Sequence, residues 1–169
     1  MKKQKQPEVW MRGPLPNIPI LLQPVAHALL QVEEDIQGIL QNVKEEQLWE
    51  SPAGAACIAF HIQHITGVID RMFTYARNER LTDLQFDDLK REGKQRTGID
   101  KKCLLKDLSE RMEQALQELA TTPVSELGEA RYLGRKRIPT TLIGLLFHAA
   151  EHSQRHFGQL LVKEKWLNA

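Results

Sequence analysis

Five of the six histidines in this chain of 169 residues lie in two short segments. One segment holds His61 and His64, and the other holds His148, His152 and His156 at intervals of four. Spacings of three and four place side chains on one face of an α-helix, on successive turns. Neutral imidazole is a good ligand for Zn, Ni, Cu and Fe. The spacing therefore predicts a metal site shared between two helices.

Helical geometry refines this prediction. At about 100° per residue, the histidines at 148, 152 and 156 fall within a wedge about 80° wide, and Gln159 falls inside the same wedge. Gln159 either packs between helices or hydrogen-bonds a ligand imidazole. Three imidazoles leave coordination positions open for water or substrate, whereas a closed structural site needs a fourth strong ligand. Cys57 is the only nearby thiol and is set about 10 Å from His64 along the helix axis, so we favour the open form.

Two competing motifs are disfavoured. The segment His148-Ala-Ala-Glu151-His152 matches the H-x-x-E-H pattern of inverted zinc proteases, with Glu151 as general base. Those enzymes use a further acidic ligand far downstream, where this chain has only Glu164. Di-iron bundles need Glu-x-x-His pairs on two helices, and the sequence contains none. A simpler alternative is that the histidines are hydrogen-bonded residues of a core, with no metal.

Composition narrows the class of protein. The formal net charge is +1, so nucleic acid is not expected as a partner, because proteins that bind it present a net basic face. Two cysteines are too few for a disulfide framework, and the start MKKQKQPEVW lacks the apolar core of a signal peptide. No run of about 18 apolar residues is present. We expect a soluble cytoplasmic protein with no membrane contact.

Hydrophobic periodicity divides the chain into a flexible arm, residues 1–16, and a single domain, residues 17–169. A first helix is predicted over residues 18–43 and a third over 100–121. The apolar positions of the first are Leu22, Leu29, Val32, Ile36, Leu40 and Val43. Those of the third are Leu104, Leu108, Met112, Leu116 and Leu119.

The two histidine segments belong to the second and fourth helices. The second is predicted to begin at Ser51, a good N-cap residue, with Pro52 in its first turn, and to end near Arg77. Its expected buried residues are Cys57, Phe60, His61, His64, Val68 and Met72. The residues expected to face water are Gln63, Asp70 and Arg71. The fourth helix should be capped by Thr140 or Thr141 and run to about residue 166.

Two long connections join these helices. Residues 78–98 should form a crossover that contains a short helix over residues 81–90, capped by Thr82. Residues 123–139 contain glycine, proline and a basic cluster, so no regular helix is expected there. The cluster consists of Arg131, Arg135, Lys136 and Arg137. It is either a solvated loop or a set of residues that attracts an anionic substrate. Four long helices and no credible strands predict an all-α four-helix bundle with sites in its interior.

The sequence resembles the DinB-like superfamily. The resemblance rests on His152-Ser-Gln-Arg-His156-Phe-Gly158-Gln159, preceded by His61-Ile-Gln-His64, and covers roughly residues 18–163. It implies a bundle of up-down-down-up topology, often homodimeric, in which His64, His152 and His156 hold a divalent metal. The metal would be Zn, Ni, Mn or Fe. The additional His61 and His148 leave the ligand set open, because either could replace a member of the three.

The resemblance implies two kinds of chemistry for a small-molecule substrate. One is metal-dependent hydrolysis, and the other is transfer to or from a low-molecular-weight thiol. The sequence places no serine, cysteine or aspartate as a nucleophile, so bound water or an external thiol is the better attacking group. The alternative is a non-catalytic dimeric bundle with a stress-response or small-ligand-binding role and no metal, in which the polar seam fixes helix register.

Overall fold

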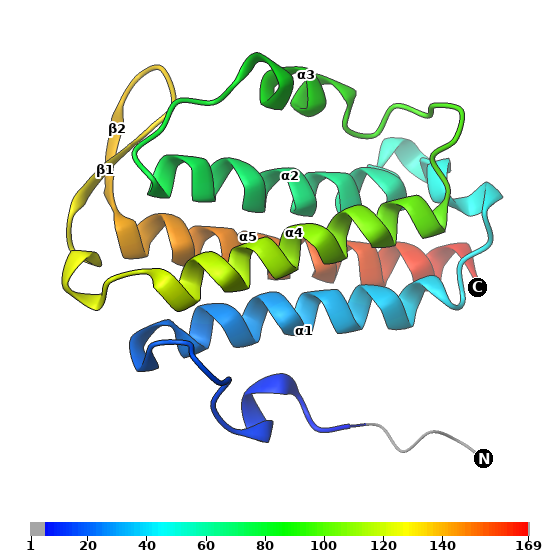
Figure 1. Cartoon of the computed structure of the whole chain (residues 1–169). Helices are drawn as coiled ribbons and strands as arrows, with labels where there is room; N and C mark the ends of the chain where they lie inside the picture. The colour runs from blue at the N-terminus through cyan, green and yellow to red at the C-terminus, as the bar shows by residue number, and fades with distance from the viewer. Residues whose placement is uncertain (1–5, 169) are drawn as a thin grey trace.

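The structure is a computed structural model that describes residues 6–168. Four long helices form most of it (Figure 1): α1 (Gln23–Leu40), α2 (Ile58–Ala76), α4 (Lys101–Thr121) and α5 (Leu142–Leu167). A short helix, α3 (Asp83–Arg91), lies in the crossover between α2 and α4. An antiparallel pair of strands, β1 (Ala130–Leu133) and β2 (Ile138–Thr141), precedes α5. Short 3-10 turns cover Val9–Arg12, Ile20–Leu22, Glu46–Trp49, Pro52–Gly54 and Val124–Glu126.

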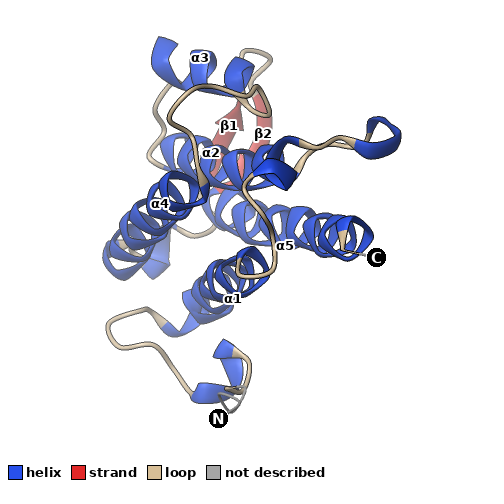
Figure 2. Cartoon of the chain, turned by 90° about the vertical axis from the view of Figure 1, so that its right-hand side faces the viewer, coloured by secondary structure: helices blue, strands red, loops and turns tan. Residues whose placement is uncertain are grey.

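The four long helices surround one apolar core. Helix α2 packs against α4 and α5, and α1 packs against the same two helices from the opposite side (Figure 2). In Figure 1, α1 and α5 run in one direction, and α2 and α4 run in the other. The largest fully buried side chains are Leu22, Leu29, Ile36, Leu48, Ile58, Ile62, Ile65, Ile69, Leu108, Met112, Leu119 and Leu146. The all-α prediction holds for most of the chain, and the most extensive helix pairing, α2 with α5, is the one that carries the histidines.

Side-chain caps set three of the helix starts where the sequence predicts them. The Thr141 hydroxyl accepts a hydrogen bond from the backbone N–H of Gly144 and begins α5. Asp100 caps α4 in the same way. Thr82 and Gln85 form a reciprocal capping box at the start of α3. The crossover helix and the third long helix are therefore confirmed at their predicted positions.

The predicted starts of the first two long helices are wrong. Helix α1 begins at Gln23 rather than at residue 18, because Pro24 in its first turn cannot donate a hydrogen bond to a preceding turn. Helix α2 begins at Ile58, after Cys57, whose sulfur accepts from the N–H of Phe60. Ser51 precedes only a 3-10 turn, Pro52–Gly54, in which Ala53 has a positive φ of 53°. Extended backbone at Ala55 and Cys57 separates this turn from α2.

The part of the N-terminal arm that the structure describes packs against α1. Val9 is buried, and its N–H donates to Gln31 Oε1 at 2.8 Å. The Arg12 guanidinium forms a two-point ion pair with Glu34. Residues 1–5 of the predicted arm lie outside the described residues.

The hairpin corrects the prediction that the chain has no strands. Its register pairs Ala130 with Thr141 and Leu133 with Ile138, around a turn over residues 134–137. Strands of four residues carry too few alternating positions to be recognised in a sequence. Pro139 is tolerated in β2 because each strand of a two-stranded sheet has one unpaired edge.

Helix α2 and the turn before it resemble a membrane-spanning segment in length and composition, although α2 lies in the core of the fold. Residues Pro52–Ala76 are long and apolar enough to span a bilayer by length and hydropathy. In the fold, α2 packs against both α4 and α5 and buries two ionisable side chains, His61 and Arg71. The core helix of a soluble protein passes the same compositional test.

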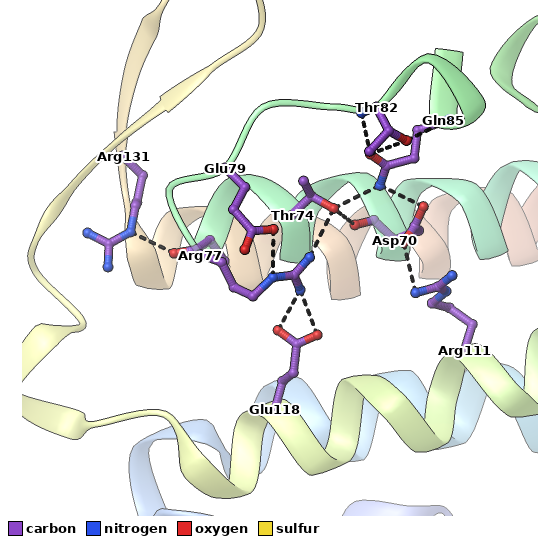
Figure 3. Close-up of polar contacts among 10 residues, drawn as sticks. Asp70, Thr74, Arg77, Glu79, Thr82, Gln85, Arg111, Glu118 and Arg131 are labelled. Atoms are coloured by element: carbon purple, nitrogen blue, oxygen red, sulfur yellow. Dashed lines mark hydrogen bonds and ion pairs between the residues drawn. The ribbon is translucent and has the colours of Figure 1, made fainter. Parts of the chain in front are cut away.

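Polar contacts fasten the C-terminal half of α2 to its neighbours (Figure 3). Asp70 accepts a hydrogen bond from Gln85 of α3 and pairs with Arg111 of α4 at 2.8 Å. Arg77 donates to both carboxylate oxygens of Glu118 on α4. Asp70 was expected to face water, but these contacts hold it between three helices.

Arg131 connects the hairpin to the end of α2 (Figure 3). Its side chain is buried, and its Nε donates to the carbonyl of Ala76 at 2.7 Å. That carbonyl lies in the last turn of α2, where a cationic donor is favourable.

We predict that Arg131→Met lowers the free energy of unfolding by about 1–3 kcal/mol, because it removes a buried charged hydrogen bond. Urea unfolding followed by circular dichroism measures the change. Lys136→Met, an exposed residue of the same hairpin, is the matched control. Equal midpoints for the two variants would show that Arg131 does not anchor the hairpin.

Candidate metal centre

The pairing of α2 with α5 brings the two histidine segments together. His64, His152 and His156 each offer one imidazole nitrogen, and these atoms lie within 4.8 Å of one another. The ring centroids of His64 and His156 are 4.4 Å apart, and those of His152 and His156 are 4.6 Å apart. Four-residue spacing on α5 puts the last two on successive turns, facing α2. These three residues, which we call the histidine cluster, are those that the resemblance implied as ligands.

His61 contacts the histidine cluster but is not part of it. Its ring is only 3% exposed, and its Nδ1 is 3.1 Å from Nδ1 of His156. One of these two nitrogens must donate the proton of this hydrogen bond. His61 thus contacts the ring of a predicted ligand, and neither group of residues that could hold a metal includes it.

His148 belongs to a second, more exposed group. His148, Glu151 and His152 also offer ligand atoms within 4.8 Å of one another. His148 Nδ1 pairs with Glu151 Oε1 at 2.9 Å, and the other neighbour of this carboxylate is Arg155 at 2.7 Å. Because His152 is common to both groups, the geometry keeps the predicted alternative with His148 open.

A buried carboxylate outside both groups orients His64. The side chain of Glu92 is 6% exposed. Its Oε2 lies 2.5 Å from Nδ1 of His64, and its Oε1 accepts a hydrogen bond from Arg71 at 2.8 Å. An ionised carboxylate only accepts hydrogen bonds, so Nδ1 carries the proton and the lone pair of Nε2 stays available. Nε2 lies 3.0 Å from Nε2 of His152, within the cluster.

Sequence reasoning missed Glu92 and misplaced Arg71, which was expected to face water but is buried. Nothing in local spacing connects residue 92 with a helix that begins more than 30 residues earlier. One signal was present at Gly67, where a Cβ would lie 2.6 Å from Arg71 Nη1 and 2.7 Å from Glu92 Oε1. A glycine inside an apolar helix can mark such a close approach.

The crossover is held over α2 next to Glu92. Gly93 has a positive φ of 74°, and its N–H donates to Gln63 Oε1 at 2.8 Å. A Cβ on this glycine would lie 3.1 Å from the ring of Phe60. Phe60 in turn stacks on His64, with ring centroids 5.2 Å apart and planes inclined by 14°. This packing fixes the position from which Glu92 reaches the imidazole.

Burial keeps three of these imidazoles neutral. Desolvation lowers the pKa of His156 to about 4, with further lowering by its neighbours His64, His152 and His61. Burial also lowers the pKa of His61 to about 4, helped by the positive charge of Lys163. The pKa of His152 is lowered for the same primary reason. Neutral imidazole is the form that binds metals, so at neutral pH His152 and His156 need no deprotonation to act as ligands.

Two other residues that the sequence suggested for the metal site, Gln159 and Cys57, lie outside the histidine cluster. Gln159 is exposed, and no hydrogen bond within residues 6–168 joins it to an imidazole. Cys57 is buried at the start of α2, and neither candidate group includes it. The donor set of the cluster is therefore three nitrogens without a thiolate. Such a set fits Zn, Ni or Fe and leaves positions for exogenous ligands.

Comparison with known proteins identifies a family for this chain. The DinB superfamily matches the chain over residues 28–160, from the first turns of α1 to the later part of α5. The match contains both histidine segments and Glu92. No curated protein matches the chain significantly. Because the matched region covers most of the sequence, the chain belongs to the DinB superfamily.

Proposed function

We propose that this protein binds a divalent transition metal through His64, His152 and His156. The observation that carries the proposal is the approach of three imidazole nitrogens from two helices to within 4.8 Å. Burial keeps two of the rings, those of His152 and His156, in the neutral form, and Glu92 fixes the proton of the third on Nδ1.

We further propose that the site acts as a metal-dependent hydrolase or a transferase that uses a low-molecular-weight thiol. When bound, such a metal supplies a Lewis acid that activates water or a thiol. Neither cysteine offers a nucleophile at the cluster, because Cys57 is buried at the start of α2 and Cys103 lies on α4. Glu151 lies beside the cluster with its side chain 32% exposed, where its carboxylate can accept a proton from the attacking group.

A second candidate function rests on the hydrogen bonds between the rings. His61 pairs with His156, and His64 pairs with His152, so the imidazoles satisfy one another without a metal. A polar seam of this kind can fix the register of α2 against α5. In this alternative the protein is a non-catalytic bundle with a stress-response or small-ligand-binding role.

The remaining proposals concern the helix topology, the location of the protein and its partners. The packing pairs and the directions of the four long helices support the up-down-down-up bundle. The burial of ionisable residues on α2 supports a soluble protein, which we place in the cytoplasm. Homodimerisation, a small-molecule substrate and the absence of a nucleic-acid partner remain expectations.

We predict that chelator-treated protein without a polyhistidine tag binds one Zn²⁺ or Ni²⁺ per chain. His64→Ala and His156→Ala should each abolish stoichiometric binding, because each removes one of three ligands. Calorimetric titration measures both the stoichiometry and the affinity. His27→Ala, which changes a half-buried histidine of α1 outside the cluster, should bind normally.

His148→Ala distinguishes the two candidate ligand groups. Unchanged affinity assigns the metal to the histidine cluster, and lost binding assigns it to the group that includes Glu151. Failure of the unsubstituted protein to bind any ion stoichiometrically would favour the non-catalytic seam.

Glu92→Gln should weaken metal binding by about 10–100-fold, because it removes the charge that polarises His64. Competition with a chromophoric chelator gives the affinity, and thermal unfolding of the metal-free variant checks its fold. Asp88→Asn removes an exposed carboxylate from α3, the helix that ends just before Glu92, and is the matched control. If both variants bind as tightly as the unsubstituted protein, Glu92 does not position His64.

The metal-free protein should lose stability as the pH falls from 6.5 toward 4. In this range an unfolded histidine, of pKa near 6.5, takes up a proton, while folded His61, of pKa about 4, does not. The unfolded state then binds more protons, so the free energy of unfolding decreases as the pH falls.

Urea unfolding in the presence of a chelator, at pH 6.5 and near pH 5, measures this dependence. His61→Gln should flatten it. An equal slope in the variant and in the unsubstituted protein would show that His61 is not buried in its neutral form.

A further inference from the structure

A separate cavity of about 430 Å³ lies between the C-terminal end of α2, helix α3 and the β1–β2 hairpin. Its volume falls within the range of small-molecule sites, roughly 300–1,000 Å³. We call it the hairpin cavity. Tyr75 lines it from α2, about 16 Å along the helix axis from His64. None of the histidine cluster lines this cavity.

The hairpin cavity combines flat rings with guanidinium groups. The rings belong to Tyr75, Phe86 and Tyr132, which come from α2, α3 and β1, and the guanidinium groups belong to Arg80, Arg135 and Arg137. Two of the cations already lie over rings: Arg137 Cζ is 4.3 Å from the Tyr132 centroid, and Arg135 Cζ is 5.3 Å from that of Phe86. A stacked guanidinium keeps its N–H donors at its edge, directed away from the ring.

The positive charge of the hairpin cavity is not neutralised. Within residues 6–168, no carboxylate forms an ion pair or hydrogen bond with any of these three arginines. Among the described residues that line the cavity, Glu79 is the only acidic one. Its carboxylate pairs at 3.0 Å with Arg77, which also pairs with Glu118, so one carboxylate is set against the three guanidinium groups of the cavity. The neighbouring pocket between α2, α3 and α4 differs in charge. Two of its arginines, Arg71 and Arg111, each pair with a carboxylate.

The turn that carries two of the arginines is held in place. The N–H of Arg137 donates to the carbonyl of Gly134 at 3.1 Å. Tyr75 and Gly134 both line the cavity, and burial raises the pKa of Tyr75, so the phenol stays protonated. Arg135 and Arg137 line the cavity, whereas Lys136 between them does not. The turn therefore places the side chains of Arg135 and Arg137 at the cavity and leaves that of Lys136 outside it.

We propose that the hairpin cavity binds a small molecule in which a planar ring carries an oxyanion, either a phosphate or a carboxylate. The ring stacks among the aromatic side chains, and the oxyanion receives the edge donors of Arg135 and Arg137. Neither contact involves the histidine cluster, so the site is independent of the proposed metal centre.

The test is calorimetric titration of the full chain with three probes: adenosine monophosphate, benzoate and inorganic phosphate. At least one ring-bearing probe should bind to one site, more tightly than inorganic phosphate does. Arg135→Gln and Arg137→Gln should each weaken this binding by about tenfold or more, because each removes a charged donor. Lys136→Gln removes the same charge from the same turn without touching the cavity, and should leave the affinity unchanged.

The probes distinguish the two oxyanions. Preference for adenosine monophosphate identifies a phosphate ester, and preference for benzoate identifies a carboxylate. His156→Ala should retain binding, which separates this result from failure of the metal centre. The proposal is overturned if no probe saturates at millimolar concentration, if inorganic phosphate binds as tightly as the ring-bearing probes, or if Lys136→Gln weakens binding as much as the arginine variants.

Discussion

The interface between α2 and α5 buries histidine rings among side chains that are otherwise mostly apolar. Polar groups removed from water are stable only if each finds a hydrogen-bonding partner. Here the rings pair across the seam, His61 with His156 and His64 with His152, and Glu92 completes the set from the crossover. The register of the two helices, the course of the crossover and the neutral state of the buried rings all follow from this requirement.

The same requirement explains why two glycines lie where a side chain would otherwise be expected. Gly67 leaves room on α2 for the pair of Arg71 and Glu92, and Gly93 lets the chain turn closely over Phe60. A charged pair buried this deeply offsets its desolvation only when its geometry is good. The crossover is thus part of the centre, although it contributes no residue to the three-histidine cluster.

Much of this arrangement could be predicted from the sequence, because helical periodicity is local. Repeats of three and four placed the long helices and put His152 and His156 on one face, and Thr82 and Thr141 marked helix starts through their own hydroxyl groups. Some of what failed depends on contacts between distant segments, and some on short local features. Glu92 meets His64 only after the crossover folds back, and strands of four residues are too short to carry a recognisable period.

Thr141 is both the last residue of β2 and the N-cap of α5. No spacer separates the strand from the helix, so a deletion that removed the hairpin would also strip α5 of its first hydrogen-bond acceptor. Insertions or deletions in this region must therefore be absorbed by the turn at residues 134–137, whose length can change without shifting the helix. Relatives of different length should diverge at that tip while keeping a hydroxyl or carboxamide residue at the junction.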